Sequence, residues 1–408
     1  MRVLLSTIGS RGDVQPLVAL ALALGARGHE PRLCAPPDFR EWIESFRLPF
    51  TPIGPEIRTT TAPGHGSTPP VFTPERRRQL AEGTVATQFE TVGAAARGCD
   101  VIVAATALQI AARSLAENIG IGYVFAAYTP TVLPSPHHPP PALPPLPDQT
   151  LPPTTDNREL WARDGARFND LFGSALNAHR ASLGLPPVSD VRGHMFTDRP
   201  WLAADPTLGP WPAEDDGVVQ TGAWMLPDDR PLPADLERFL DTGDAPVYFG
   251  FGSMRPPDAP AQVLARVDAA RAVGRRAIVS AGWADLSALD GQSDCLVITE
   301  ANLQALFPRV AAVVHHGGAG TTTLAGRAGA PQVIIPQVYD QHYWARRVGE
   351  LGIGTTIALA DVTTESLTGA LAHALQSDVV DRAHAIARAI RSDGAEAAAR
   401  RLESFGQR

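Results

Sequence analysis

The stretch Val313-Val314-His315-His316-Gly317-Gly318-Ala319-Gly320-Thr321-Thr322-Thr323 decides the fold of this chain. The apolar run from Ala311 to Val314 is typical of a buried strand, and a helical pattern begins at Thr321–Thr323. The glycines between them let a ligand approach the backbone, and the new helix offers unpaired N–H groups and the positive end of its dipole. The stretch therefore predicts an anion site that suits a diphosphate. The alternative is an ordinary strand-to-helix turn with glycines for tight packing.

The composition is that of a globular protein of 408 residues, which is long enough for two domains. Of these residues 44% are hydrophobic, and the net charge of −8 argues against nucleic-acid binding. Cys34, Cys99 and Cys295 lack metal-ligand spacing, so we expect buried thiols in a reducing compartment. The N-terminus is typical of a strand rather than a signal peptide, and no apolar run reaches membrane-spanning length. We expect a cytoplasmic protein, monomeric and without membrane contact.

Strand and helix patterns alternate along both halves of the chain. Arg2–Thr7 is an apolar strand that a turn, Ile8–Asp13, joins to a long helix ending at Gly28. A second alternating series begins with the strand Val247–Phe251. Such alternation is typical of parallel α/β sheets, so we predict two Rossmann-like domains that face a cleft.

The region around Trp201–Pro227 has no strong period, and it contains several prolines and a glycine. We therefore predict an N-terminal domain at 1–205, a linker at 206–227 and a C-terminal domain at 228–408. We leave open that the last helix crosses back to the N-terminal domain. Two irregular stretches, 55–74 and 130–153, follow strand ends in the first domain, where such folds bind ligands, and we expect acceptor-binding loops rather than plain linkers.

Common motifs of other enzyme classes are missing from the sequence. The glycines of Gly9–Gly12 and Gly250–Gly252 lack the G-x-G-x-x-G spacing of dehydrogenases, and there is no P-loop. There is also no G-x-S-x-G, H-E-x-x-H or D-x-D. Without a motif for a metal clamp, helix ends and side chains would neutralise a diphosphate. We therefore predict no metal site and no cofactor.

Several phrases resemble the nucleotide-sugar glycosyltransferases of the GT-B fold. They are Gly9–Leu20, Val247–Ser253, His315–Thr322 and Asp340-Gln341. Others, among them Arg32–Asp38 and Gln220–Trp224, narrow the resemblance to bacterial enzymes that glycosylate antibiotics of the vancomycin and teicoplanin type. The resemblance runs nearly end to end. His137-His138 stand where tyrosines are expected in a related proline-rich loop, which affects the acceptor rather than the chemistry.

The resemblance implies roles for individual residues. Asp13 would be the general base that takes the acceptor proton, although an Asp at a helix start is often only an N-cap. His316 would contact the phosphate, while His315 packs against the sheet. Asp340 and Gln341 would read donor-sugar hydroxyls, and the nucleobase would lie near Glu300, Asn302 and Leu303.

Further candidates for phosphate binding follow from the residue type and its position in the sequence. Arg11 could pair with a phosphate, or it could be a solvated surface residue. Ser253 could bind a phosphate oxygen, or it could cap the next segment. The complete diphosphate set that we predict is Ser10, Arg11, Gly12, Ser253, His316, Gly317, Gly318, Ala319, Gly320 and Thr321.

The sequence thus predicts an inverting, metal-independent glycosyltransferase that moves a sugar from a dTDP- or UDP-sugar to a hydroxyl of a glycopeptide aglycone. Two alternatives stay open: a nucleotide-sugar epimerase, and a non-catalytic protein that binds sugar nucleotides. The sequence specifies neither the sugar nor the acceptor hydroxyl.

Overall fold

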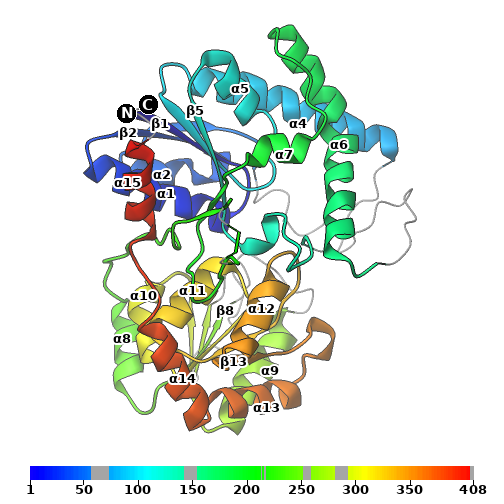
Figure 1. The fold of residues 1–408 in the computed structure, drawn as a ribbon. Coiled ribbons are helices and arrows are strands. Elements are labelled where there is room, and N and C mark those ends of the chain that lie inside the picture. Colours follow the sequence, from blue (N-terminus) through cyan, green and yellow to red (C-terminus); the bar gives the residue numbers. More distant parts are fainter. Residues whose placement is uncertain are drawn as a thin grey trace. The chain divides into compact units, whose positions relative to one another are not determined.

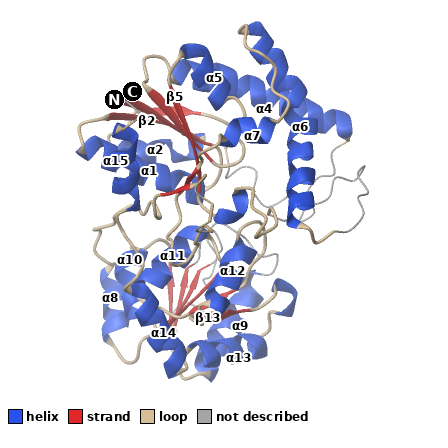
Figure 2. Cartoon of the chain, viewed as in Figure 1, coloured by secondary structure: helices blue, strands red, loops and turns tan. Residues whose placement is uncertain are grey.

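The computed structural model describes residues 1–56, 73–141, 154–212, 214–215, 217–250, 259–280 and 293–404. They form two compact units, each built on a parallel sheet. The first comprises Met1–Pro206, Pro210–Leu226 and Arg391–Arg408, and the second comprises Thr207–Gly209 and Pro227–Ile390. Helices alternate with the strands in both units (Figure 2).

The sheet of the first unit has the strand order β3-β2-β1-β4-β5-β6-β7, and every pairing is parallel. Its strands are β1 Arg2–Thr7, β2 Glu30–Ala35, β3 Phe50–Pro52, β4 Val101–Ala105, β5 Gly122–Ala127, β6 Trp201–Leu202 and β7 Val219–Gln220. Its α-helices are α1 Arg11–Ala26, α2 Arg40–Ser45, α4 Pro74–Ala95, α5 Ala112–Ile119, α6 Asn157–Ser182, α7 Val191–Phe196 and α15 Gly394–Glu403.

Side chains along β1 point alternately to the two faces of the sheet, and both faces are covered by helices. Val3 and Leu5 point to one face and are buried under residues of α1 and α15. Leu4 points to the other face and is buried under α4 and α5. The last helix, α15, therefore packs in the first unit beside α1 (Figure 1), although the second unit precedes it in sequence.

The sheet of the second unit has the order β10-β9-β8-β11-β12-β13, again all parallel. Its strands are β8 Val247–Gly250, β9 Ala277–Ser280, β10 Cys295–Ile298, β11 Ala312–His315, β12 Gln332–Ile334 and β13 Gly354–Thr356. Its α-helices are α8 Ala234–Asp241, α9 Ala259–Ala272, α10 Leu303–Leu306, α11 Ala319–Ala328, α12 Gln341–Glu350, α13 Thr364–Ala374 and α14 Ser377–Ala387.

The prediction of two parallel Rossmann-like sheets is confirmed, with local differences. The helix α11 begins at Ala319, two residues before the expected Thr321, because Gly318 already has extended N-cap geometry. Two strands, β6 and β7, lie in the region where no period was visible, because each contains only two residues. Pro210–Leu226, which falls in the expected linker, packs with the first unit. Among the described residues, no helix is both long and apolar enough to span a bilayer.

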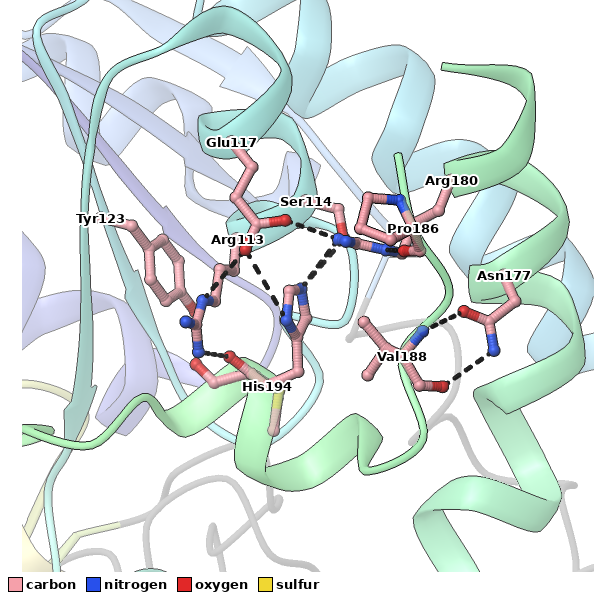
Figure 3. Close-up of polar contacts among 10 residues, drawn as sticks. Arg113, Ser114, Glu117, Tyr123, Asn177, Arg180, Pro186, Val188 and His194 are labelled. Atoms are coloured by element: carbon pink, nitrogen blue, oxygen red, sulfur yellow. Dashed lines mark hydrogen bonds and ion pairs between the residues drawn. The ribbon is translucent and has the colours of Figure 1, made fainter. Parts of the chain in front are cut away.

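A buried polar network holds α6 and α7 against α5 (Figure 3). Arg180, only 3% exposed, donates from Nη1 to Ser114 Oγ and Glu117 Oε2, each at 2.7 Å, and it lies 3.3 Å from His194 Nε2. Arg113 donates to the backbone oxygen of His194 at 2.7 Å. Burial, assisted by the charges of Arg113 and Arg180 and opposed by Glu117, lowers the pKa of His194 from 6.5 to about 4. The imidazole is therefore neutral and accepts from Arg180.

Because of the lowered pKa of His194, we predict that the free energy of unfolding falls as the pH is lowered. Because the folded pKa lies below the unfolded one, the unfolded chain binds more protons between pH 6.5 and 4. The stabilising contribution of neutral His194 is complete above pH 6.5 and falls as the pH drops, by up to about 3 kcal/mol. We expect His194→Gln, which keeps an acceptor for Arg180, to lower stability at pH 7.5 and to have a smaller deficit at pH 4.5. Urea unfolding at both pH values measures this difference, and an equal deficit at both would contradict it.

Candidate active site

The stretch at 313–323 lies at the topological switch point of the second sheet. The strands β8 and β11 are neighbours there, and the chain continues from them to opposite edges of the sheet. In open parallel sheets, ligands bind in the crevice at the carboxyl ends of the strands that border this point. The turn after β11, His316–Gly318, lies there. Ser253, which follows β8 in the sequence, is outside the described residues.

Two of the three glycines in this turn have a clear steric reason. Gly317 has φ of 89°, in the left-handed region, and a Cβ there would lie 2.7 Å from Ile334 Cγ2 and 3.1 Å from the backbone oxygen of Gln341. A Cβ on Gly318 would lie 2.6 Å from His316 Nε2. Gly320 is different, because it is exposed and has open space around its Cα. That space lets a ligand reach the backbone of the helix end.

The N-terminus of α11 has no side-chain cap. Its N-cap residue, Gly318, cannot supply one, and its carbonyl accepts from the N–H and the hydroxyl of Thr322, each at 3.0 Å. The hydroxyl of Thr323 donates back to the carbonyl of Ala319 at 2.8 Å. None of the described groups accepts from the N–H groups of Ala319, Gly320 and Thr321. Uncompensated donors at the positive end of a helix dipole are suited to a phosphate.

His316 lies beside this helix end with its ring half-buried against Gly318. Burial lowers the pKa of His316 to about 4, so the imidazole is neutral near pH 7. Its Nδ1 atom is buried and has no hydrogen-bond partner among the described residues. A buried nitrogen without a hydrogen-bond partner is unfavourable for the folded state. A bound phosphate would raise the pKa of His316.

The structure brings Gln341 against the glycine turn, and Asp340 precedes Gln341 at the start of α12. The backbone oxygen of Gln341 lies near Gly317, as the 3.1 Å separation above indicates. Gln341 Oε1 accepts from the N–H groups of Gln337 and Val338 at 2.8 and 3.2 Å, while its amide nitrogen donates to none of the described residues. Asp340 Oδ2 accepts from Trp344 Nε1 at 2.9 Å. Each side chain therefore orders the start of α12, and the Gln341 amide still has donors to offer a ligand.

The three residues of the expected nucleobase region differ in their surroundings. Asn302 is buried; its Oδ1 caps α10 by accepting from two N–H groups, and its Nδ2 donates to the backbone oxygens of Asp228 and Arg230. These four bonds give Asn302 a structural role. Glu300 is exposed and pairs with Arg230 at 3.6 Å, and Leu303 is partly buried in the core of the second unit.

In the first unit, Asp13 lies in the first turn of α1, after the inner strand β1. Its Oδ2 accepts from the N–H of Ser10 at 2.6 Å and from the Ser10 hydroxyl at 3.1 Å. Oδ1 has no hydrogen-bond partner among the described residues. Burial raises the pKa of Asp13, and the bonds from Ser10 oppose this. The carboxylate is thus held by one oxygen and has the other free to accept a proton.

Two residues that the sequence did not single out support Asp13. A Cβ on Gly9 would lie 2.2 Å from Asp13 Oδ2, so only glycine leaves room for this carboxylate. Tyr128, which follows β5, donates its hydroxyl to the backbone oxygen of Asp13 at 3.1 Å. The contact of Tyr128 with Asp13 depends on the sheet order, which the sequence pattern does not contain, whereas Gly9 lies only four residues before Asp13.

The other candidates of the first unit are exposed. The Arg11 guanidinium lies over the ring of Trp42, 4.5 Å from its centroid, and Nε donates to Gln15 at 3.2 Å. Gly12 is exposed. Their assignment to the diphosphate stays a prediction. Within the described ranges there is no cluster of three or more His, Cys, Asp or Glu residues that could hold a metal ion.

Two family models match parts of this chain. Residues 3–134 match the family model described as the glycosyltransferase family 28 N-terminal domain. Residues 285–399 match the erythromycin biosynthesis protein CIII-like, C-terminal domain. The second match includes the glycine turn, α11 and the Asp340-Gln341 pair.

Similar proteins extend over nearly the whole chain. The vancomycin aglycone glucosyltransferase of Amycolatopsis orientalis is 48% identical, covering 98% of this chain and 97% of its own. The dTDP-epi-vancosaminyltransferase of the same organism is 44% identical, covering 94% and 92%. Among solved structures, the calicheamicin glycosyltransferase CalG4 matches with a TM-score of 0.73 at 20% identity, over 100% of this chain and 98% of its own.

The steric role of Gly317 leads to a binding prediction. Gly317→Ala forces a side chain into the left-handed region, at about 1–2 kcal/mol, and into contact with Ile334. We expect the affinity for dTDP or UDP, measured by calorimetry, to fall at least about tenfold. Gly349→Ala on α12, where an added Cβ meets nothing within 4 Å, is the matched control and should bind like the parent. Equal affinities in the two variants would mean that the turn does not bind the diphosphate.

Proposed function

The chain belongs to the glycosyltransferase family that includes the vancomycin aglycone glucosyltransferase of A. orientalis, and we propose that it transfers one sugar from a dTDP- or UDP-sugar to a hydroxyl of a glycopeptide aglycone. The end-to-end similarity to relatives that act on such molecules supports the acceptor class. It also favours a transferase over an epimerase or a non-catalytic binding protein. We propose inversion at the anomeric carbon.

The observation that carries this proposal is the uncapped end of α11 at the switch point, with His316 beside it. Three N–H groups without an acceptor among the described residues, together with the helix dipole, would provide fixed donors for the diphosphate of the donor. As the bond from the anomeric carbon to the phosphate oxygen breaks, negative charge grows on that oxygen. Donors that are already oriented stabilise this charge without reorganisation. His316 would add a further hydrogen bond, so the diphosphate would leave without help from a metal ion.

Asp13 would act on the acceptor. The attacking hydroxyl oxygen forms its bond to the anomeric carbon while its proton moves to Asp13 Oδ1, and the nucleoside diphosphate departs from the opposite face. A raised pKa suits this task, because an ordinary carboxylate is a weak base toward a phenol or an alcohol. Transfer requires the proton acceptor and the leaving group on opposite sides of one carbon.

The remaining predicted residues would bind the sugar and the base of the same nucleotide-sugar donor. Asp340 and Gln341 would read sugar hydroxyls, with the Gln341 amide nitrogen as donor. Glu300 and Leu303 would lie near the base, while Asn302 would shape this region through its capping bonds. Buried free thiols at Cys34, Cys99 and Cys295 are consistent with the cytoplasmic location that we propose. The monomeric state stays a prediction.

The role of Asp13 predicts a separation between turnover and donor binding. We expect Asp13→Asn to lower kcat by about 10²–10⁴-fold and to leave dTDP affinity unchanged, because the residue lies in the first unit and the helix-end site in the second. Gly9→Ala should lower kcat at least about tenfold, because its Cβ displaces the carboxylate. Single-turnover kinetics and calorimetry measure the two quantities.

Gly25→Ala is the control for Gly9→Ala, because Gly25 lies near the far end of α1, the helix that carries Asp13, and an added Cβ there meets nothing within 4 Å. It should turn over like the parent. Full activity of Asp13→Asn would remove this residue from the mechanism. Loss of nucleotide affinity in Asp13→Asn would show that it acts on binding instead.

A substrate screen tests the proposed function as a whole. The enzyme is incubated with panels of dTDP- and UDP-sugars and glycopeptide aglycones, with and without EDTA, and products are read by mass spectrometry. We expect one added sugar and no effect of EDTA. Absence of product with every glycopeptide acceptor would reject the acceptor class, and an altered sugar without acceptor would indicate an epimerase.

A further inference from the structure

The two adjacent histidines of the glycine turn have different surroundings. His315 ends β11 and is completely buried, whereas His316 is half-buried at the helix end. The rings lie edge to face, with centroids 6.3 Å apart. The role proposed above uses only His316. His315 has no access to solvent and so cannot touch the donor. Its hydrogen bonds to neighbouring residues show what it does instead.

The hydrogen bonds of His315 define its protonation state. The N–H of Gly317 donates to His315 Nδ1 at 3.1 Å, so Nδ1 must lack a proton. In the neutral ring the proton is then on Nε2, which lies 2.9 Å from Gln332 Oε1 and donates to it. In an imidazolium, Nδ1 also carries a proton and faces the N–H of Gly317, so the hydrogen bond from Gly317 to Nδ1 would be lost. The contact with Gly317 therefore exists only while His315 is neutral.

Gln332 extends this arrangement to α11. It lies on β12 and is fully buried, and its amide nitrogen lies 3.4 Å from the backbone oxygen of Thr322 in α11. A line of hydrogen bonds thus runs from Gly317 through His315 and Gln332 to Thr322. It joins the residue before the N-cap to the first turns of the helix. The strands β11 and β12, paired from Val313 to His315, fix the two side chains relative to each other.

The surroundings of His315 keep it neutral. Burial lowers the pKa of His315 to about 3, the neighbouring His316 adds to this, and the bond to Gln332 opposes it. Among the residues that the structure describes, His316 is the titratable group with a charge effect on this ring, and the facing residues on β12 and α11, Gln332 and Thr322, carry no charge. A carboxylate at position 332 would instead favour the protonated ring and raise the pKa of His315.

We propose that His315 and Gln332 are positioning residues for the donor diphosphate: neutral His315 holds the N–H of Gly317, and this fixes the left-handed turn that aligns the helix end of α11. The inference rests on the proposed function of that helix end. Gly317 is confined on its other sides by Ile334 and Gln341, so its N–H is the part of the turn that a hydrogen bond must orient. His315 determines how the phosphate donors are presented, and His316 contacts the ligand.

A pair of substitutions at position 315 separates positioning from filling of space. The side-chain oxygen of Asn can replace Nδ1 as the acceptor for Gly317, whereas Gln is closer in size to His and can replace only Nε2. We expect His315→Asn to keep dTDP affinity within about threefold of the parent and His315→Gln to lose at least about tenfold. Calorimetry with dTDP, in the absence of acceptor, measures both. A residue that merely fills space would give the opposite order, and that order or equal affinities would overturn the inference.

Gln332→Glu provides a second test with a different readout. A carboxylate next to Nε2 raises the pKa of His315, so the imidazolium forms as the pH falls and the bond from Gly317 is lost. The KM for the donor should rise at least about tenfold from pH 8.5 to pH 6 in this variant and stay nearly constant in the parent, while the KM for the acceptor follows the parent. A donor KM of the variant that follows the parent at every pH would contradict the inference.

Thermal unfolding of each variant at the assay pH shows that it is folded. The two proposals can fail separately. If the parent does not bind nucleoside diphosphates, the proposed function fails. If the parent binds and His316→Ala weakens binding while the variants at 315 and 332 do not, only the positioning role fails.

Discussion

The uncapped N-terminus of α11 is the constraint on which the second unit depends. Three consecutive N–H groups lack acceptors among the described residues, at the switch point of a fully parallel sheet. A helix end left in this state is unfavourable unless water or a ligand satisfies it. The glycines around it each leave room: Gly317 for the left-handed turn, Gly318 for the ring of His316, and Gly320 for a ligand. The glycines thus keep side chains away from the helix end at which we propose that an anion binds.

In each unit, a helix begins directly after a strand that borders the switch point, but the residues at the two helix ends differ. In the first unit, α1 follows β1, a strand that borders the switch point, and its first turn carries Asp13, which bonds back to Ser10. An acidic residue there compensates the helix dipole and gains a raised pKa from burial. In the second unit, α11 follows β11 and carries no acid in its first turn. Under the proposed function, the first helix end would supply the base and the second the anion site, which are the two parts that sugar transfer from a nucleotide needs.

The sequence predicted what depends on local pattern. Apolar runs such as Val313–Val314 gave the strands, and the glycine turn gave the helix end, because both follow from residues next to each other in the chain. The long helix α6 was missed, since few of its residues are buried and its apolar period is weak. Contacts between distant positions were also missed: Gln332 with His315, Tyr128 with the backbone of Asp13, and Asn302 with the backbone at 228–230. These require the strand order and the path of the chain, which no local pattern contains.

A crystal structure of the enzyme with dTDP tests the central claim most directly. The account predicts diphosphate oxygens within hydrogen-bond distance of the N–H groups of Gly320 and Thr321 and of the His316 ring, with no divalent ion bridging them. Asp13 should turn its Oδ1 toward the side from which an acceptor would approach the bound diphosphate. A diphosphate bound away from α11, or held there by a metal ion, would contradict the account.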